Sequence, residues 1–442
     1  MFAALDIQGS VQSQIQFPVL STDTRNLRPG SVFVALQGAK HDGHDFLTAA
    51  AASGAALAVV QRIPEGSAPL PLLCVNDTLL AFGHMARSKR RHLSAKVIAV
   101  VGSNGKTSTR DMLSAILSDF FCVHSTKNNE NNLIGVPKTL LEAKQDNDIV
   151  IVELGTSKKG EIARAASMAE PDIVVFTSLS DEHLEGLGDS AGVFQEECSV
   201  FQYLRPSAKA FIPSHLRNVI RVARLFAEDV HLVPSVAGSA QGAPSQAYID
   251  KRGFARFFFE GNYLSIPYAA LAFADNASLA LHVAKSLGMS SAQAQSALQG
   301  MRPTPLRAEL RLVGGFRVLA DCYNANPASF RVAIETMEQL QGRRIAFIGT
   351  MDELGKQSTV LHQQVAQQIA TAGFDRIVAI GKFAEVFAKR PLFSSTPCIL
   401  AQSVEQGFEL LRAQLVGGEA ILFKASRRLR LERFIDQLVQ SP

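Results

Sequence analysis

The chain has 442 residues, of which 47% are hydrophobic and 19% are charged, and its formal net charge is +4. This length predicts two to four domains, and the composition is that of an ordinary globular protein with ample core. The small net charge excludes a protein that binds nucleic acid through bulk charge. The 5 cysteines are scattered and form no CxxC pair. This argues against a disulfide framework or structural zinc and favours a reducing cytosol.

No segment is typical of a signal peptide or a membrane span. The first ten residues, MFAALDIQGS, have no basic region before an apolar run. The most apolar windows, such as AAASGAALAVV (50–60), are short and rich in Ala and Gly. We therefore expect a cytoplasmic protein with no membrane span and no nucleic-acid partner.

Short apolar runs rich in β-branched residues alternate with helical patterns about 10–15 residues long. We expect strands at SVFVAL (31–36), VIAVVG (97–102), DIVIVELG (148–155), DIVVFTSL (172–179), RIAFIGT (344–350) and RIVAIG (376–381). This alternation is typical of parallel sheets with helices on both faces. The predicted fold class is α/β.

Two breaks divide the chain. The basic segment ARSKRRHLSAK (86–96) is interpreted as a solvated helix end followed by a linker. In GMRPTPLRAEL (300–310), two prolines interrupt a helix before strand character resumes. We therefore predict three domains: 1–87, 88–308 and 309–442.

The segment VIAVVGSNGKTSTRDMLSAIL (97–117) reads as a buried strand, a glycine-bearing turn and an amphipathic helix. GSNGKT is shorter than the standard GxxxxGK[ST] loop, but its mechanics are the same. Gly102 and Gly105 permit a tight turn with inward-facing N–H groups, Lys106 supplies a positive charge, and Thr107 offers a hydroxyl to Mg²⁺. We expect ATP or GTP to bind here.

Carboxylates follow two later strands, and ligands gather beyond the carboxyl ends of parallel strands. Glu153 ends one strand, and Asp181, Glu182, His183 and Glu185 follow another. Mg²⁺ takes oxygen ligands, so Thr107 and Glu153 are the candidates for the nucleotide's metal. His183 is either a ligand to a second metal or a helix-capping residue. HDGHDF (41–46) is expected to be a loop without a metal.

A further carboxylate stands on an apolar helix face. Val193, Glu197, Val200 and Leu204 share one face, whereas the neighbouring Glu196 points elsewhere. A carboxylate turned inward is costly unless it meets a cation, a metal or hydrogen-bond donors.

Motifs in a fixed order cover nearly the whole chain: STDTRNLRPGSVFVALQGAKHDGHDF (21–46), GSNGKTS (102–108), KNNENNLIGVP (127–137), VELG (152–155), GEI (160–162), HLEGLG (183–188), DNASLAL (275–281), DCYNANPASF (321–330), MDELG (351–355) and KASR (424–427). Together they resemble the Mur ligases, the ATP-dependent enzymes that extend the peptide stem of the bacterial cell-wall precursor. The D-[ND]-P-R signature of the ligase for diaminopimelate or lysine is missing, which favours the member that adds D-Ala-D-Ala.

The resemblance implies a UDP-sugar-binding N-terminal α/β domain, a central P-loop domain for ATP, and a Rossmann-like C-terminal domain. The last would close over ATP and bind the incoming amine. It further implies that a monomer uses ATP and Mg²⁺ to join D-Ala-D-Ala to UDP-MurNAc-tripeptide through an acyl phosphate.

The resemblance also assigns site residues. Those implied in catalysis are Lys106, His183, Glu197 and Arg307. Those implied at ATP are Gly102, Ser103, Asn104, Gly105, Lys106, Thr107, Ser108, Asn276 at the adenine, Arg307 near the γ-phosphate, Asp321 near the ribose and Asn326 supporting the closed site. Those implied at the UDP-sugar peptide are Ser21, Thr24, Arg25, Gln37, Gly38, Asn131 and Asn132. Those implied at metal are Thr107, Glu153, His183 and Glu197.

Glu197 departs from the family pattern. Family members carry a lysine here that CO₂ converts to a carbamate, which helps to hold a second Mg²⁺. No lysine occurs between Lys159 and Lys209. Glutamate is a permanent carboxylate but is shorter by several Å by ordinary bond lengths. Three consequences are open: the helix that carries Glu197 lies closer to the metal, a water bridges Glu197 to the metal, or the second metal site is weakened.

Three readings compete with an active D-Ala-D-Ala ligase that uses Glu197 in place of the carbamate. The chain could bind nucleotide or UDP-sugar and ligate poorly, or it could join another amine or peptide. A generic P-loop phosphotransferase or GTPase is disfavoured, because no NKxD-type base-reading loop stands in a suitable place. The third residue of the tripeptide, diaminopimelate or lysine, stays open.

Overall fold

The computed structural model describes residues 19–38, 41–65, 67–238, 246–389 and 396–440. The first ten residues, MFAALDIQGS, for which we expect no signal peptide, lie outside these residues. The chain forms two compact units, Met1–His92 and Leu93–Pro442. In the part of the chain that the structure describes, no helix is both long enough and apolar enough to cross a membrane.

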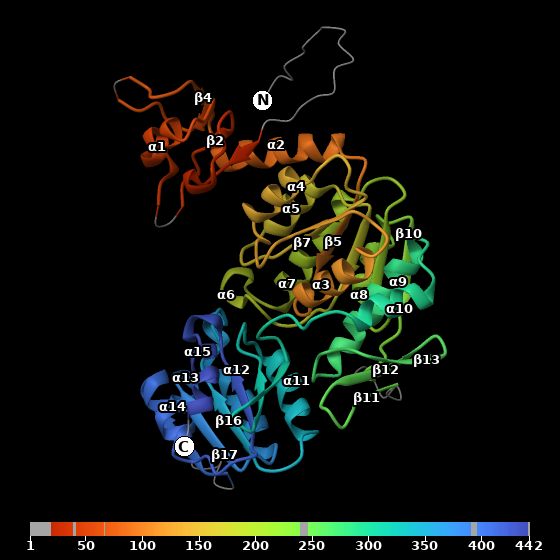
Figure 1. The fold of residues 1–442 in the computed structure, drawn as a ribbon, viewed down its shortest axis with the longest axis vertical. Coiled ribbons are helices and arrows are strands. Elements are labelled where there is room, and N and C mark those ends of the chain that lie inside the picture. Colours follow the sequence, from red (N-terminus) through yellow and green to blue (C-terminus); the bar gives the residue numbers. More distant parts are fainter. Residues whose placement is uncertain (1–18, 39–40, 66, 239–245, 390–395, 441–442) are drawn as a thin grey trace. The chain divides into compact units, whose positions relative to one another are not determined.

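The first unit, orange to red in Figure 1, holds a parallel sheet in the order β1-β2-β3-β4. Its elements are β1 (Leu20–Ser21), β2 (Val32–Val34), α1 (Leu47–Ala52), β3 (Leu57–Val60), β4 (Leu72–Cys74) and α2 (Thr78–His92). Phe33, Ala58 and Val60 bury their side chains against Leu47 of α1. This small apolar core fixes the positions of the loops that follow β1 and β2.

The second unit begins with a six-stranded sheet in the order β10-β9-β8-β5-β7-β6, in which every neighbouring pair is parallel. Its strands are β5 (Lys96–Val101), β6 (Val123–Ser125), β7 (Ile149–Glu153), β8 (Ile173–Phe176), β9 (Lys209–Pro213) and β10 (Asp229–Val233). β5, β7 and β8 are almost entirely buried, as expected for parallel strands covered on both faces. The strands predicted at 97–102, 148–155 and 172–179 are confirmed.

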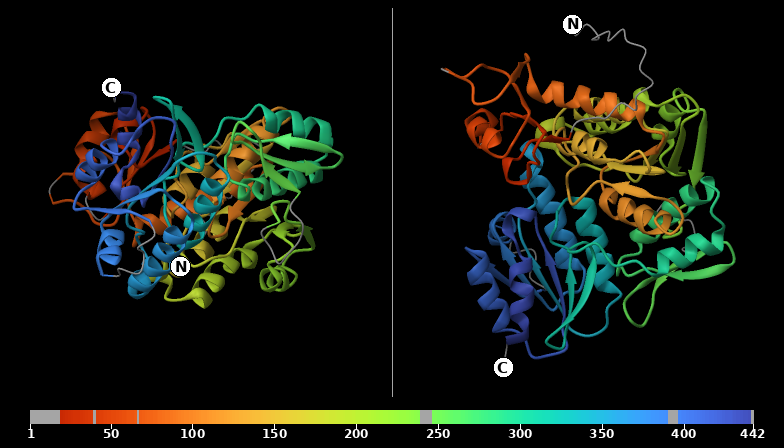
Figure 2. Two further views of the ribbon diagram at one scale, coloured as in Figure 1. Left: turned by 90° about the horizontal axis from the view of Figure 1, so that it is seen from below. Right: turned by 45° about the horizontal axis from the view of Figure 1, so that its top comes forward.

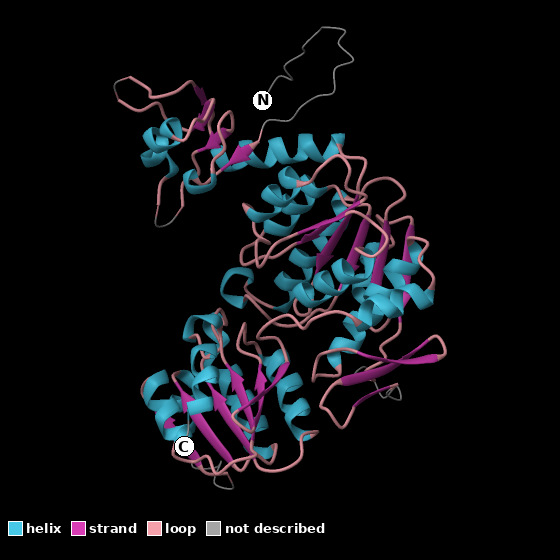
Figure 3. Cartoon of the chain, viewed as in Figure 1, coloured by secondary structure: helices cyan, strands magenta, loops and turns pink. Residues whose placement is uncertain are grey.

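Helices cover both faces of this sheet (Figures 1 and 3). α3, α9 and α10 pack against one another on one side, and α4 and α5 pack together on the other. The helices are α3 (Lys106–Leu117), α4 (Gly135–Glu142), α5 (Glu161–Ala169), α6 (Leu184–Leu187), α7 (Ser190–Cys198), α8 (Arg217–Ala223), α9 (Ala272–Ser286) and α10 (Ser291–Gln299).

An antiparallel three-stranded sheet, which the sequence did not predict, is formed by β11 (Ala247–Ile249), β12 (Ala255–Phe259) and β13 (Asn262–Ser265). Both views of Figure 2 show its green strands beside the teal helices α9 and α10. Phe257, Phe259 and Leu264 face inward and join the core that α3 and α9 share. Alternate residues such as Phe258 and Tyr263 stay exposed.

A second six-stranded sheet, in the order β14-β15-β19-β16-β17-β18, completes this unit. Its strands are β14 (Glu309–Val313), β15 (Phe316–Ala320), β16 (Arg344–Ile348), β17 (Arg376–Ile380), β18 (Cys398–Ala401) and β19 (Ala420–Lys424). Only the pairing of β14 with β15 is antiparallel. Its helices are α11 (Pro327–Glu338), α12 (Ser358–Thr371), α13 (Lys382–Lys389), α14 (Val404–Arg412) and α15 (Glu432–Ile435).

The strands of this sheet bury both faces. Ala346 and Ile348 of β16 face the core under α11, α12 and α13, and Ile345 and Phe347 face the core under α14 and α15. The predicted α/β class, with parallel sheets between helices, is confirmed.

The interpretation of 86–96 as a solvated helix end is wrong in part. α2 continues to His92, and Arg90 within it is fully buried. Arg90 therefore belongs to the packed part of the protein and not to a linker.

Candidate functional site

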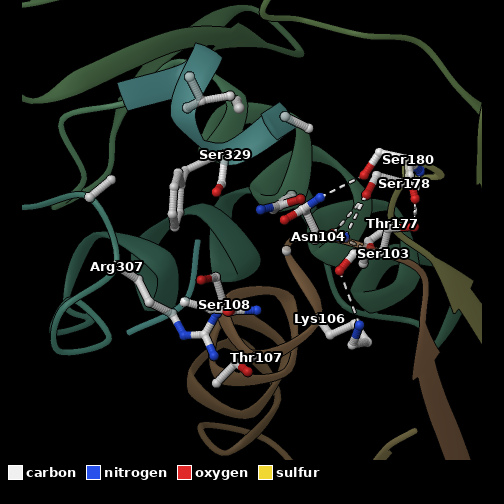
Figure 4. A pocket seen from close by; sticks show the side chains of 18 of the residues that line it. Ser103, Asn104, Lys106, Thr107, Ser108, Thr177, Ser178, Ser180, Arg307 and Ser329 are labelled. Atoms are coloured by element: carbon white, nitrogen blue, oxygen red, sulfur yellow. Dashed lines mark hydrogen bonds between the residues drawn. The ribbon is translucent and has the colours of Figure 1, made fainter. Parts of the chain in front are cut away.

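A cavity of about 930 Å³ lies within the second unit, at loops that follow strands of both its six-stranded sheets. The phosphate loop Gly102–Ser108 contributes all its residues except Gly102 to the lining. The loops after β6, β7, β8 and β15, the start of α9, the segment before β14 and one face of α11 also contribute to the lining. Figure 4 shows the phosphate loop and Arg307 converging on this space. Ligands of open α/β sheets gather at such strand ends.

The phosphate loop needs its two glycines. Gly102 and Gly105 have φ values of 123° and 85°. A Cβ on Gly102 would lie 2.6 Å from Thr177 Oγ1, and one on Gly105 would lie 2.7 Å from Asn276 Oδ1. The loop can therefore pass between these neighbours only without side chains there. Gly105 stands at the start of α3, whose free N–H groups attract anions.

The remaining loop residues are held by the loop after β8. Asn104 N donates to Ser178 Oγ at 2.8 Å, and Ser103 Oγ donates to the Ser180 carbonyl at 2.9 Å. Asn104 Nδ2 donates to Ser180 Oγ at 2.8 Å. These bonds, drawn in Figure 4, fix the loop in its turn.

Lys106 is turned back onto its own loop. Its Nζ donates to the carbonyls of Gly102 at 2.5 Å and Ser103 at 3.1 Å, and lies 3.4 Å from Glu182 Oε1. Burial lowers the pKa of Lys106, but the nearby carboxylates of Glu182, Glu197 and Glu153 outweigh burial and raise it. Lys106 is therefore a charged group in a site that gathers negative groups.

Thr107 and Glu153, the two predicted ligands of the nucleotide's metal, lie together. Thr107 Oγ1 donates to Glu153 Oε1 at 3.0 Å, and Asn131 Nδ2 donates to the same oxygen at 2.8 Å. The other oxygen, Oε2, accepts from Arg110 at 3.0 Å. Sequence reasoning missed Arg110, which sits one helical turn after Lys106 and is almost wholly buried.

Glu197 is fully buried, as its position on the apolar face predicted. Its Oε2 accepts from the Gly102 N–H at 3.0 Å. Its Oε1 has no hydrogen-bond partner among the described residues. Burial raises the pKa of Glu197 to about 7 although Lys106 opposes the shift, and Glu182 raises it further. Glu197 sits behind the phosphate loop and is not part of the cavity wall.

Glu196 points away from the face that carries Glu197, as predicted, but it is buried as well, which the sequence did not predict. Its Oε2 accepts from Gly160 N at 2.7 Å. Its Oε1 accepts from Ile162 N at 2.8 Å and from Thr156 Oγ1 at 3.1 Å. The carboxylate thus holds the loop after β7 to α7. Helical periodicity missed its burial because its partners come from the loop after β7 and the start of α5, and not from an apolar stripe.

His183 stands at the start of α6 with a φ of 50°, and its side chain makes no capping hydrogen bond. Its Nδ1 bonds to Glu353, and its Nε2 lies 3.9 Å from Glu182 Oε2. Burial lowers the pKa of His183, but the bond to Glu353 and the charge of Glu182 outweigh it, so the pKa is raised. Among the described residues no three His, Cys, Asp or Glu side chains form a group that could hold a metal.

Of the predicted ATP-binding residues outside the phosphate loop, Asn276, Arg307 and Asp321 line the cavity and Asn326 does not. Asn276 on α9 lines the cavity beside Gly105, and Arg307 and Asp321 line the opposite wall. Asp321 Oδ1 accepts from Ala308 N at 3.1 Å, and its Oδ2 accepts from Lys424 Nζ at 2.5 Å. Asn326 begins α11 and donates from Nδ2 to Asn104 Oδ1 at 2.9 Å, so it joins the two sheets' domains at the phosphate loop.

Two asparagines predicted to bind the peptide substrate line the cavity, and the side chains of both already make hydrogen bonds within the protein. Asn131 bonds Glu153, as described above. Asn132 Oδ1 accepts from the N–H groups of Ile134 and Gly135 at 3.0 and 2.9 Å and so holds the start of α4.

The predicted uridine-binding residues belong to the first unit. Ser21 ends β1, Thr24 and Arg25 follow it, and Gln37 and Gly38 follow the adjacent β2. Arg25 is highly exposed and pairs with Asp23 at 2.6 Å. The two loops thus leave the same edge of one sheet.

In HDGHDF, His44 has both ring nitrogens engaged. Nδ1 bonds Asp42 Oδ1 at 2.6 Å, and Nε2 accepts from Gln61 N at 2.9 Å. The imidazole therefore has no nitrogen left for a metal.

The fold and the phosphate loop define a nucleotide-binding α/β protein with a second α/β domain facing the loop. Family models agree across the chain: "Mur ligase family, catalytic domain" matches residues 17–87, "Mur ligase middle domain" matches 100–284, and "Mur ligase, glutamate ligase domain" matches 306–427. The chain belongs to the Mur ligase family.

Several named relatives cover nearly the full length. The UDP-N-acetylmuramoyl-tripeptide–D-alanyl-D-alanine ligase of Escherichia coli (strain K12) is 33% identical over 388 residues, which are 85% of this chain and 84% of that protein. The enzyme of the same name from Bacillus subtilis (strain 168) is 29% identical over 436 residues, 96% and 93% of the two chains.

Solved structures have the same fold. The crystal structure of MurF from Acinetobacter baumannii matches with a TM-score of 0.84 and 26% identity, covering 95% of this chain and 93% of that one. The Thermotoga maritima MurF ligase in complex with ADP matches with a TM-score of 0.82 and 24% identity, covering 96% and 97%.

Proposed function

We propose that this chain joins D-Ala-D-Ala to UDP-MurNAc-tripeptide at the expense of ATP. A carboxylate oxygen of the tripeptide attacks the γ-phosphorus, the bond to ADP breaks, and an acyl phosphate forms. The amine of the dipeptide then attacks the acyl carbon, the bond to phosphate breaks, and the nitrogen loses a proton as the amide forms. The observation that carries the proposal is one cavity that holds the phosphate loop, the Thr107–Glu153 pair and Arg307 together.

The chemistry needs charge neutralisation on the transferring phosphoryl group and alignment of two reactants, and no protein nucleophile. Lys106 supplies positive charge, and Arg307 supplies it from the opposite wall, near the γ-phosphate. Asn276 faces the adenine and Asp321 the ribose. Asn326 supports the closed arrangement through its bond to Asn104.

The chain's residues fit Mg²⁺. Thr107 and Glu153 present oxygens side by side, and Glu197 carries a buried oxygen without a partner among the described residues. Hydroxyl and carboxylate oxygens are the ligands that Mg²⁺ takes. Thr107 and Glu153 would hold one ion, and Glu197 with His183 would hold a second. When bound, Mg²⁺ neutralises charge on the phosphate oxygens.

Glu197 replaces the carbamylated lysine in this proposal. Its free oxygen stands behind the phosphate loop, next to the charge of Lys106. A glutamate needs no CO₂ to carry its charge. The proposed ligase is therefore independent of CO₂.

We further propose the domain roles: residues 1–87 bind the UDP sugar through Ser21, Thr24, Arg25, Gln37 and Gly38, residues 88–308 bind ATP, and residues 309–442 close over ATP and bind the dipeptide. Asn131 and Asn132 contact the peptide substrate. A monomer in the cytoplasm, where nucleotide-linked precursors are made, fits this role. All five cysteines are free, as expected in a reducing compartment.

One assay tests the proposal. Purified protein with ATP, Mg²⁺, UDP-MurNAc-tripeptide and D-Ala-D-Ala should release phosphate only when both substrates are present. Tripeptides ending in diaminopimelate and in lysine are compared in parallel. Release without dependence on the dipeptide contradicts the proposal. Release with another amine alone points to a different amine substrate, and nucleotide binding without release points to a binding protein.

A further inference from the structure

Arg307 is placed by an unusual stretch of backbone. The residues on either side of it, Leu306 and Ala308, have φ values of 61° and 44° and are buried. Non-glycine residues avoid this left-handed region, and such strain persists only where the surroundings enforce it. The chain therefore holds Arg307 in a conformation that an unconstrained loop would not keep.

Two carboxylates enforce this backbone. Leu306 N donates to Glu309 Oε2 at 2.9 Å, and Ala308 N donates to Asp321 Oδ1 at 3.1 Å. Tyr323 N donates to the Leu306 carbonyl at 3.2 Å, which ties the same segment to the loop after β15. The backbone is thus held on both sides of Arg307.

The side chain of Arg307 lies on an aromatic ring. Its Cζ is 4.2 Å from the centroid of the Tyr323 ring. Both residues line the cavity, and Figure 4 shows the guanidinium reaching toward Thr107 and Ser108 at the start of α3. Arg307 Nε is buried without a hydrogen-bond partner in the described part of the chain. A cation over a ring face keeps its N–H groups free for an anion.

We propose that Tyr323 is a positioning residue that holds the Arg307 guanidinium, through its ring face, ready for the terminal phosphoryl group of ATP. This inference rests on the proposed function for the identity of the anion. Tyr323 acts through the face of its ring and not through its hydroxyl. Its removal should weaken contacts to the third phosphate and leave those to the first two unchanged.

The test is calorimetric titration of the full chain with a non-hydrolysable ATP analogue and with ADP, both with Mg²⁺. Tyr323→Leu should weaken analogue binding about 2- to 30-fold, the range of a cation–π contact, and leave ADP binding unchanged. Tyr323→Phe, which keeps the ring face, should bind like the wild type. In an Arg307→Ala background, Tyr323→Leu should have no further effect.

Phe434→Leu is the matched control, because its ring carries Arg433 at 4.7 Å in the same domain but does not line the cavity. It should bind both nucleotides like the wild type. The inference is overturned if Tyr323→Leu weakens binding of the ATP analogue and of ADP equally. It is also overturned if Tyr323→Leu still weakens analogue binding in the Arg307→Ala background, or if Tyr323→Phe binds the analogue as weakly as Tyr323→Leu. Because binding is measured without the peptide substrates, the outcome is separate from that of the ligation assay.

Discussion

The two walls of the cavity hold Lys106 and Arg307, the cations proposed to meet the γ-phosphate, in opposite ways. The middle wall is the side formed by the sheet that contains β5 and the phosphate loop, and its cations already have partners. Lys106 pairs with Glu182 and with backbone carbonyls, and Arg110 behind it pairs with Glu153. On the wall from the second sheet, Arg307 lies on a ring with its Nε unpaired among the described residues. We therefore expect Lys106 to exchange partners when a nucleotide binds and Arg307 to keep its place. The predictions below test that contrast.

The largest effect is expected at Lys106. Lys106→Ala removes the positive charge that the phosphate loop presents to the transferring group. The loss of one such stabilising group costs about 10²- to 10³-fold in turnover. ATP-dependent phosphate release measures it. Lys209→Ala, at the start of β9, is the control and should leave turnover unchanged; a Lys106 variant with near-normal turnover would place the charge elsewhere.

Glu197→Ala should lose most activity, about 10- to 100-fold, as for other groups that support a metal. Mn²⁺ binding followed by electron paramagnetic resonance should show a weakened site. Wild-type activity should be the same with and without CO₂, because glutamate needs no carboxylation. Wild-type turnover of Glu197→Ala at low Mg²⁺ would remove Glu197 from the metal site.

Glu196→Ala tests whether the middle wall depends on its buried anchors. The change leaves the N–H groups of Gly160 and Ile162 without their acceptor, whereas the Thr156 hydroxyl keeps the Lys158 carbonyl at 2.9 Å. Unpaired buried donors cost about 1–3 kcal/mol each, so the free energy of unfolding in urea should fall by at least that amount. Glu228→Ala, an exposed carboxylate in the same domain, should change it little. Equal stability of the two variants would show that the loop after β7 keeps its conformation without Glu196.

A smaller effect is expected at Lys158 and Lys159, which are exposed on the loop that Glu196 holds. Neither makes an ion pair within the described residues. If they meet a carboxylate of the peptide substrate, the double change to alanine should raise KM for UDP-MurNAc-tripeptide about 2- to 5-fold, since exposed charge contacts are weak.

KM for ATP should not move in that double variant. Lys96→Ala, at the opposite end of the sheet's strands, is the control. Unchanged KM for the tripeptide would show that the two lysines are solvated.

The smallest effect concerns the first unit, where a carboxylate serves structure alone. The His44 N–H and then the Arg62 guanidinium hold the pKa of Asp42 well below its usual range. A lowered pKa contributes stability above the unfolded value of about 3.9, and this is lost as the pH falls below it. Hydrogen exchange of β3 should be faster in Asp42→Asn at pH 6, and the gap should narrow below about pH 4. A gap that is constant with pH would contradict the role.

Much of the phosphate-loop side of the site could be predicted from the sequence. The phosphate loop, Thr107, Glu153 and the inward face of Glu197 follow from local patterns: a glycine-bearing turn between strand and helix, a strand end, and a 3.6-residue period. The opposite wall could not be predicted in this way. The resemblance to the Mur ligases named Arg307, Asp321 and Asn326, but the Tyr323 ring and the strained backbone that place Arg307 had no local signal.

The neighbouring residues Glu196 and Glu197 show how far prediction from the sequence reaches. The sequence by itself determined that a carboxylate is buried on α7, because hydrophobic periodicity is a local property of the helix. Only the tertiary structure decided that both are buried and that each binds a different loop: Gly102 N for Glu197, and the Thr156–Ile162 segment for Glu196. The physical reason is that a buried carboxylate is stable only beside donors, and these donors come from segments about 35 to 95 residues away in the chain.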